Sequence, residues 1–238
     1  MGKEELHYKN IPIRAAGNLH KKAIELIKGL EIPPGSTFLD LGAGEGAFSK
    51  RLQDNNYRVT AVELEKDRFY VEGITCLDID LNTSFSEIFS FKYDFIIAFE
   101  LLEHMENPWH FLRECYKILK VSGYLLISSP NVESWKSRLV FLKNGCLDWF
   151  SEKDYYKYGH YNPIFYSLIK IIASETGFKI LKFDHTCNKL LVKNVLKGAN
   201  KFKNYLILIS FILLKPFMKG NISGEINLFS LQKQDYKL

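Results

Sequence analysis

Residues 38–47 of the chain read FLDLGAGEGA. The apolar run before this turn predicts a short strand, 37–39, that ends at Asp40. The glycines that follow predict a turn into a helix that runs to about residue 53. A strand, a glycine-rich turn and a helix in this order are typical of the first unit of an α/β fold, in which a ligand lies at the turn.

The same alternation continues on both sides of this unit. Helical spacing is present at three further places, 18–30, 108–119 and 163–175. Apolar or alternating runs predict strands at 58–62, 74–77, 95–98, 124–128, 178–183 and 225–231. Strands that alternate with helices form crossover units. We therefore expect a Rossmann-like open α/β sheet of about seven mostly parallel strands with helices on both faces, the last strand being antiparallel.

Length and composition favour one globular domain. The chain has 238 residues, of which 47% are hydrophobic and 25% charged, and these values exclude a disordered or fibrous protein. We expect a single domain over 1–238, with a lid-like insert at about 132–162 and an apolar insert at about 190–222. The net charge is 32 − 27 = +5, which is too small and too diffuse to indicate DNA as a partner.

The cysteines and the first residues indicate in which cellular compartment we expect the protein. The four cysteines form no CxxC pair, which favours reduced thiols. The first residues, MGKEEL, are charged and contain no apolar signal-peptide core. No run reaches the ~18 apolar residues of a membrane-spanning helix. The sequence therefore predicts a cytoplasmic protein.

Acidic residues follow most of the predicted strands. Asp40, Glu63, Asp78 and Glu100 lie at the carboxyl ends of four of them, where ligands bind in open α/β sheets. The loop also fits the dinucleotide fingerprint GxGxxA, but Asp40 and Glu45 would repel a pyrophosphate. A cationic ligand without phosphate fits better. S-adenosylmethionine has a sulfonium and an ammonium, and its carboxylate can accept from the loop N–H groups.

Four segments in order carry a family resemblance: LDLGAGEGAFSKRL (39–52), VTAVELEKD (59–67), DFIIAFELLEHMENPWHFLRECYKILK (94–120) and GYLLISSPN (123–131). Together they resemble the class I S-adenosylmethionine-dependent methyltransferases over about residues 18–190. The most similar members are the ubiquinone-biosynthesis O-methyltransferases and the sugar and small-molecule methyltransferases that share the LEH element.

The resemblance implies that S-adenosylmethionine is the cofactor, and it assigns residues to each part of that molecule. The methionine half of the cofactor is assigned to Asp40, Gly42, Gly44 and Gly46. Glu63 and Leu64 are assigned to the ribose and the adenine edge. Asp78 and Ile79 are assigned to the adenine. Glu100 and Leu101 are expected to lie near the sulfonium. The implied activity is methyl transfer, which we expect to act on an oxygen of a small-molecule or glycan-like acceptor.

His104 is the candidate general base, because it follows the fourth strand at the expected cofactor mouth and an imidazole titrates near neutral pH. An alternative uses the ExxEH pattern of Glu100, Glu103 and His104 together with His160. This pattern resembles the metal-binding set of the small-RNA 2′-O-methyltransferases, and such residues suit a divalent ion. The alternative function is therefore a metal-assisted RNA 2′-O-methyltransferase, against which the modest net charge weighs.

Two further segments leave alternatives open. The aromatic stretch at 149–161 is expected to form a substrate lid, or else to be ordinary surface packing. The segment 201–219 contains the apolar run 205–214 between lysines. It can be a buried or lid helix, a peripheral contact with the inner face of a membrane, or a homodimer face. A membrane-associated cofactor-binding module without catalysis is the alternative of another class.

Overall fold

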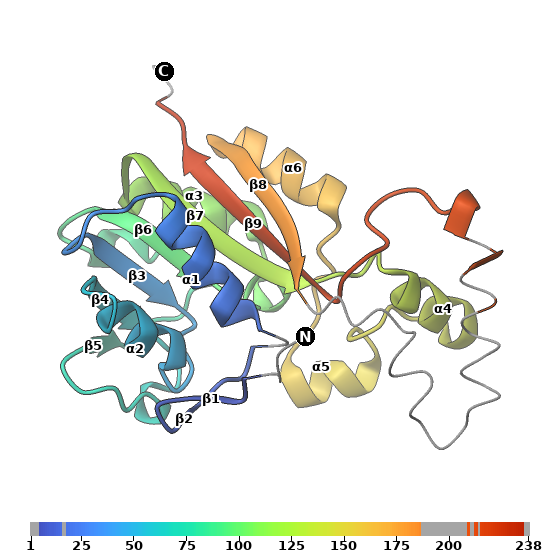
Figure 1. Ribbon diagram of the computed structural model, residues 1–238, viewed down its shortest axis with the longest axis horizontal. Coiled ribbons are helices and arrows are strands. Elements are labelled where there is room, and N and C mark those ends of the chain that lie inside the picture. Colours follow the sequence, from blue (N-terminus) through green and yellow to red (C-terminus); the bar gives the residue numbers. More distant parts are fainter. Residues whose placement is uncertain (1–4, 16–17, 187–208, 210–211, 214, 236–238) are drawn as a thin grey trace.

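The computed structural model describes residues 5–15, 18–186, 209, 212–213 and 215–235, and it is built around one seven-stranded sheet (Figure 1). The strand order is β5-β4-β3-β6-β7-β9-β8. Their bounds are β3 Thr37–Leu41, β4 Arg58–Val62, β5 Thr75–Leu77, β6 Tyr93–Ala98, β7 Leu119–Pro130, β8 Phe178–Thr186 and β9 Ile226–Lys233. The pairs from β5 to β7 are parallel, and β9 runs antiparallel to both of its neighbours. The predicted fold class and the antiparallel last strand are confirmed.

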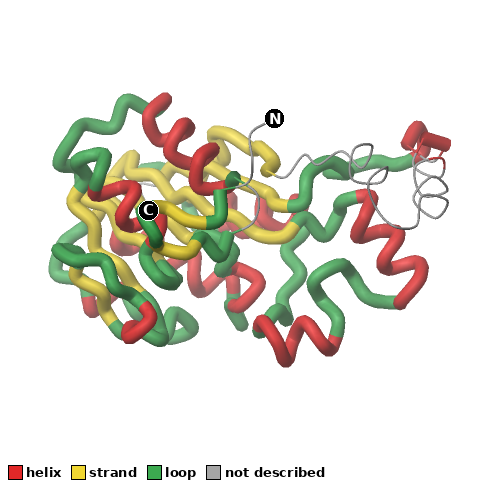
Figure 2. The backbone as a smooth tube through the Cα atoms, turned by 60° about the horizontal axis from the view of Figure 1, so that its bottom comes forward, coloured by secondary structure: helices red, strands yellow, loops and turns green. Residues whose placement is uncertain are grey.

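Helices cover both faces of the sheet, as the sequence predicts (Figures 1 and 2). One face packs against α1 (Leu19–Gly29) and α2 (Ala47–Gln53). The other packs against α3 (Pro108–Ile118) and α6 (Tyr166–Glu175). Because side chains alternate along a strand, Phe38 contributes to the first core and Leu39 to the second. Each such fully buried side chain stabilises the fold by about 1.5–3 kcal/mol.

The junction between α3 and β7 differs from the prediction. The sequence predicts a helix over 108–119 and a separate strand over 124–128. The helix instead ends at Ile118, and β7 begins at Leu119. A Cβ on Gly123 would lie 2.9 Å from the Lys120 carbonyl oxygen. This glycine therefore permits a close backbone approach inside an irregular strand instead of ending the helix.

Two short helices lie between β7 and α6. They are α4 (Trp135–Asn144) and α5 (Glu152–Tyr158). Figure 1 shows both beyond the end of the sheet to which the β3 arrow points. Helix α5 begins with a capping box, in which Ser151 and Asp154 satisfy each other's backbone N–H groups. The stretch at 132–162 thus places an ordered helical element beyond the carboxyl ends of the strands.

A hairpin of β1 (His7–Tyr8) and β2 (Ile11–Pro12) packs on α2 near the amino terminus. Tyr8 donates a hydrogen bond to Asp54 at 2.9 Å, and the Arg51 guanidinium lies 4.0 Å from the centre of the Tyr8 ring. These contacts bring the segment that follows the hairpin, including Arg14, to the glycine loop. Short 3₁₀ turns complete the fold at η1 Lys66–Arg68, η2 Ser86–Ile88, η3 Leu102–His104 and η4 Lys215–Phe217.

The apolar insert falls largely outside the described residues. Within 190–222 the structure describes 209, 212–213 and 215–222, so the expectations for 205–214 are not addressed. Among the described residues, no helix has both the length and the apolar character needed to cross a bilayer.

Candidate active site

A cavity of about 520 Å³ lies at the carboxyl ends of the central strands. Six parts of the chain meet around it: the strand ends, the glycine loop with the start of α2, the segment after the amino-terminal hairpin, α1, η1, and the end of α5 with the residues that follow. The polar side chains that line it are Arg14, His20, Asp40, Glu45, Arg68, Glu100, His104, Lys157, Tyr158 and His160. The size suits a nucleoside-sized ligand together with part of a second molecule.

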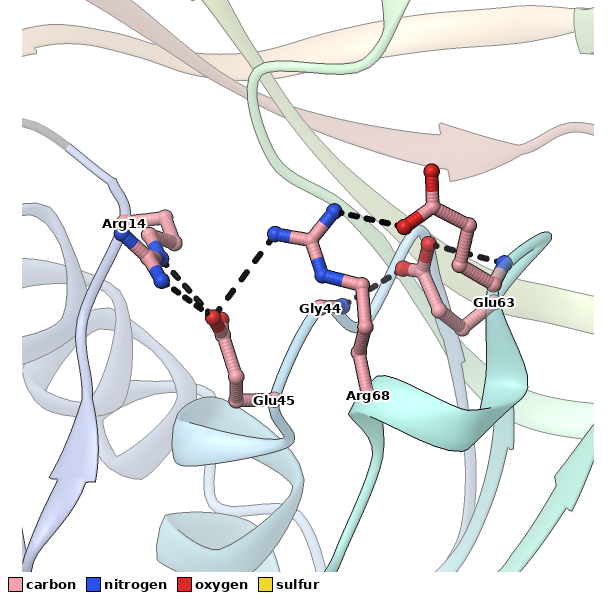
Figure 3. Close-up of polar contacts among 6 residues, drawn as sticks. Arg14, Gly44, Glu45, Glu63 and Arg68 are labelled. Atoms are coloured by element: carbon pink, nitrogen blue, oxygen red, sulfur yellow. Dashed lines mark hydrogen bonds and ion pairs between the residues drawn. The ribbon is translucent and has the colours of Figure 1, made fainter.

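The glycine loop uses its N–H groups inside the protein. The N–H groups of Gly42 and Ala43 donate to the Val62 carbonyl at 2.9 and 3.0 Å. The Gly44 N–H donates to Glu63 Oε2 at 2.7 Å (Figure 3). The expectation that a ligand carboxylate accepts from the loop N–H groups stays a prediction, and these three groups already have acceptors in the protein. The loop shapes the cavity wall, and charge for a ligand must come from side chains.

The three loop glycines have different reasons to be glycine. All adopt positive φ: 70° at Gly42, 55° at Gly44 and 89° at Gly46. A Cβ on Gly46 would lie 2.5 Å from Val71 Cγ2, so this position has no room for a side chain. A Cβ on Gly44 would meet nothing within 4 Å. Gly44 therefore keeps space free at the cavity wall, whereas Gly46 serves packing.

Glu45 is paired with arginine, contrary to the expectation that it leaves the loop negatively charged. Its carboxylate accepts from Arg14 Nε at 2.8 Å and Nη2 at 2.6 Å, and Arg68 Nη2 lies 3.7 Å away (Figure 3). Three acids (Asp40, Glu45 and Glu100) and three cations (Arg14, Arg68 and Lys157) line the cavity. The rim is thus balanced in charge. Sequence reasoning missed Arg14, because no motif surrounds it and it lies 31 residues before its partner.

Asp40 lies at the end of β3 with its carboxylate buried beneath the loop. It accepts from Ser49 Oγ at 2.6 Å. Burial is the main cause that raises the pKa of Asp40 to about 7, and the nearby charge of Glu63 adds to the increase. A cationic group of a ligand placed here would favour the ionised form.

The parallel strands bring several of the predicted residues to one edge. Asp40, Gly42, Gly44, Glu100, His104 and His160 line the cavity. Glu100 has a positive φ of 47°, an unusual conformation for a residue with a side chain. The other predicted residues do not line it: Gly46, Glu63, Leu64, Asp78, Ile79, Leu101 and Glu103. Among these, Leu64 is 62% exposed and Ile79 is buried in the core.

His104 and His160 meet where the residues after α5 approach the turn that follows β6. Their ring centroids lie 4.8 Å apart. His104 Nδ1 lies 3.1 Å from the Gly159 carbonyl oxygen, and His160 Nδ1 lies 3.1 Å from that of Trp149. Burial lowers the pKa of both imidazoles, and for His104 the neighbouring His160 lowers it further. Both rings are therefore neutral at neutral pH and have an accepting nitrogen.

Backbone contacts hold the residues after α5 against the turn that follows β6. The N–H groups of Tyr161 and Asn162 donate to the Glu103 carbonyl at 3.2 and 3.1 Å. Asn162 Nδ2 donates to the Met105 carbonyl at 3.0 Å. Residues almost sixty positions apart are thereby fixed together, which spacing along the sequence does not reveal.

Glu103 is fully buried behind the two imidazoles. Neither of its carboxylate oxygens has a hydrogen-bond partner in the described part of the chain. Burial, and next the charge of Glu100, raise the pKa of Glu103 well above its ordinary value. One ligand atom each from Glu103, His104 and His160 lie within 4.8 Å of one another. Three of the four residues in the predicted metal set thus converge, without Glu100.

Comparison with known proteins adds family and fold. A family model described as a methyltransferase domain matches residues 15–182. A ubiquinone biosynthesis O-methyltransferase of Hydrogenovibrio crunogenus is 27% identical over 135 residues, 52% of this chain and 56% of that protein. The bifunctional methionine biosynthesis protein MetXA/MetW of Rhodopirellula baltica is 30% identical over 126 residues, 48% of this chain and 20% of that protein. The chain spans about half the length of the first of these relatives and less of the second.

Solved structures show the same fold at low identity. A SAM-dependent methyltransferase from Archaeoglobus fulgidus superposes with a TM-score of 0.62 and 18% identity over 90% of this chain and 94% of that one. Phosphoethanolamine N-methyltransferase 2 of Haemonchus contortus, in complex with S-adenosyl-L-methionine, gives a TM-score of 0.59 and 16% identity over 95% of this chain and 55% of that one.

Proposed function

The chain belongs to the methyltransferase-domain family of class I S-adenosylmethionine-dependent enzymes, and we propose that it methylates an oxygen atom of a small-molecule or glycan-like acceptor. The main support is one cavity that joins the glycine loop to a neutral imidazole, His104. The ubiquinone-biosynthesis relatives are named as O-methyltransferases, which favours oxygen as the acceptor atom.

The charged residues at the loop suit the two ends of the methionine half. In this proposal the ammonium of S-adenosylmethionine lies at Asp40, and its carboxylate pairs with Arg14 in place of Glu45. Gly42 and Gly44 leave space for the methionine half, and Gly46 allows the turn to pack closely. Glu63 accepts from the ribose hydroxyls, Leu64, Asp78 and Ile79 bind the adenine, and Glu100 and Leu101 lie near the sulfonium.

Methyl transfer itself needs alignment more than activation, because the sulfonium is already a good leaving group. The acceptor oxygen attacks the methyl carbon, the carbon–sulfur bond breaks, and its electron pair stays on sulfur to give S-adenosylhomocysteine. The acceptor proton moves to the accepting nitrogen of His104. The Gly159 carbonyl at Nδ1 selects the tautomer in which Nε2 accepts.

The lid side of the cavity suits a ring-shaped acceptor. Tyr158 and Lys157 line it, and the Lys157 ammonium lies 4.6 Å from the centre of the Tyr158 ring. Trp149 packs edge-on against Tyr158 with ring centroids 6.0 Å apart. Aromatic faces stack on planar rings and on sugars, so phenols and glycans with a free hydroxyl are the acceptors to test first.

The test is an acceptor screen with isotopically labelled S-adenosylmethionine, followed by mass spectrometry of the product. We expect a methyl ether, and we expect His104→Asn to lower kcat by about 10²–10⁴-fold while S-adenosylhomocysteine affinity is kept. His110→Asn is the control, because His110 contacts the Thr83 carbonyl away from the cavity. Product methylated on nitrogen or carbon, transfer only to RNA, or full activity of His104→Asn would contradict the proposal.

A further inference from the structure

Glu45 is a buried carboxylate that lies between two arginines at the cavity wall (Figure 3). Its side chain is only 7% exposed, whereas that of Arg14 is 70% exposed. Oε1 of Glu45 accepts from Nε and Nη2 of Arg14 at 2.8 and 2.6 Å. Nη2 of Arg68 lies 3.7 Å from the same oxygen. Arg14 is therefore the hydrogen-bonded partner in this structure, and Arg68 lies just beyond hydrogen-bond distance.

The second oxygen of Glu45 shows that its pairing with Arg14 is incomplete. Oε2 is buried and has no hydrogen-bond partner in the described part of the chain. A guanidinium pairs best with a carboxylate when two parallel N–H groups reach both oxygens, yet both contacts from Arg14 end on Oε1. A buried acceptor without a donor costs free energy. Glu45 thus has an unused acceptor, and Arg68 is a donor close to it.

Arg68 can approach Glu45 without losing its own neighbour. It ends the turn η1, where its Nη1 donates to Glu65 Oε2 at 3.1 Å while its Nη2 faces Glu45 (Figure 3). Charged hydrogen bonds measure about 2.7–2.9 Å, so a movement of about 1 Å would bring Nη2 to the Glu45 carboxylate. Glu65 is exposed, and an exposed ion pair holds a guanidinium only weakly. Arg68 is therefore free to make this movement.

We propose that Arg68 is a positioning residue for the cofactor, which takes over Glu45 when Arg14 turns to the carboxylate of S-adenosylmethionine. The exchange rests on the proposed function, in which that carboxylate replaces Glu45 at Arg14. All three side chains line the cavity, so the exchange takes place at its wall. Arg68 acts through Glu45 and does not itself contact the cofactor.

The exchange keeps every charge paired. In the free protein Glu45 neutralises Arg14, and it competes with the cofactor for this guanidinium. In the complex the cofactor carboxylate neutralises Arg14, and Arg68 neutralises Glu45. Without Arg68, the complex would contain a buried carboxylate that has lost its partner, which costs far more than the loss of an exposed pair. The contribution of Arg68 to binding should therefore depend on the negative charge of Glu45.

The test is a double-mutant cycle on the affinity for S-adenosylhomocysteine, measured by calorimetry with the full chain. We expect Arg68→Ala to weaken binding about 10-fold or more when Glu45 is present. In the Glu45→Gln background we expect a loss of less than about 2-fold, because a neutral amide needs no cation beside it. Glu45→Gln alone should bind at least as tightly as the wild type, because Arg14 no longer has a competing carboxylate.

Arg58→Ala is the matched control. Arg58 begins β4, at the opposite end of that strand from Glu63, and its Nε donates to the Gly35 carbonyl at 2.7 Å. It does not line the cavity. Removal of this arginine should leave S-adenosylhomocysteine affinity unchanged in both backgrounds.

Thermal melts separate the exchange from a structural role of Arg68. In the free protein this side chain pairs with exposed Glu65 and lies 3.7 Å from Glu45. Arg68→Ala should therefore change the melting temperature of the free protein by no more than about 2 °C. It should also reduce the increase in melting temperature that saturating S-adenosylhomocysteine produces. A large loss in the free protein, with an unchanged increase on binding, would contradict the exchange.

The cycle distinguishes failure of the exchange from failure of the proposed function. An equal loss from Arg68→Ala in both backgrounds would overturn the exchange, because Arg68 would then act on the cofactor without Glu45. Wild-type affinity in Arg68→Ala would overturn it as well. Both results leave the methyltransferase proposal intact, since the cofactor still binds. A wild-type chain that does not bind S-adenosylhomocysteine would overturn the exchange and the proposed function together.

Discussion

At the residue scale, Asp40 connects pH to cofactor binding. Burial raises its pKa to about 7, so the carboxyl group is partly protonated at neutral pH. An ammonium placed beside it favours the ionised form. We expect S-adenosylhomocysteine affinity to increase between pH 6 and pH 8, by at most about tenfold per pH unit. Calorimetry at several pH values would check this, and Asp40→Asn should remove the dependence. An unchanged pH dependence in that variant would place the titrating group elsewhere.

The same carboxyl group affects the stability of the free protein. Its folded pKa of about 7 lies above the ordinary value of 3.8, so the folded state binds the proton more tightly than the unfolded state does. Its contribution to stability therefore falls as pH rises from about 4 to 7, by an upper limit of about 4 kcal/mol, and stays constant above. Asp40→Asn should raise the melting temperature relative to wild type at pH 8 and not at pH 4. An equal effect at both would contradict the shift.

Gly44 and Gly46 make a second pair of predictions at this scale. Gly46→Ala forces a methyl group against Val71 and should lower the melting temperature. Gly44→Ala meets no atom within 4 Å, so its cost is mainly the left-handed backbone, about 1 kcal/mol. The methyl group of Gly44→Ala enters space that the cofactor needs in our proposal. We therefore expect Gly44→Ala to lose more S-adenosylhomocysteine affinity than Gly46→Ala does. Thermal melts and calorimetry on both variants separate the effects. Wild-type affinity in Gly44→Ala would exclude that surface as a cofactor wall.

At the element scale, the lid that we propose around α5 depends on the contacts after this helix. Asn162→Ala removes the bond to the Met105 carbonyl, which is worth about 1 kcal/mol. We expect a higher acceptor KM with unchanged S-adenosylhomocysteine affinity, because the lid lines the acceptor side of the cavity. Asn55→Ala removes the same kind of bond, to the Arg51 carbonyl, in the turn after α2, which is distant in sequence from α5. Equal kinetic effects of the two variants would contradict a lid role for α5.

The elements show what a sequence can and cannot predict. The strand at Arg58–Val62 was predictable because a short apolar run between turn residues has few other solutions. Asp40, Glu100 and His104 were predictable at the cavity because parallel strands place their carboxyl ends at one edge. The α3–β7 junction was not predictable, because a side chain at Gly123 would also lie 3.1 Å from the carbonyl oxygen of Asp94, on the neighbouring strand. Arg14 and the carbonyl partners of both histidines depend on distant segments, which no local pattern encodes.

At the scale of the whole molecule, the strand ends, the glycine loop and the end of α5 line a cavity whose charges are nearly balanced. The pairing of Glu45 with Arg14 means that repulsion by acids does not explain selectivity against phosphates. Selectivity for a sulfonium ligand must come instead from how Asp40, Arg14 and the engaged loop N–H groups are placed. A pyrophosphate would find the N–H groups of Gly42, Ala43 and Gly44 already used.

The most direct measurement is therefore calorimetric titration of the full chain with S-adenosylhomocysteine and, separately, with NAD. We predict that S-adenosylhomocysteine binds with one molecule per chain, and that NAD at the same concentrations gives no saturable heat. Firm binding of NAD, with no response to S-adenosylhomocysteine, would contradict the assignment of this cavity to a methyl donor.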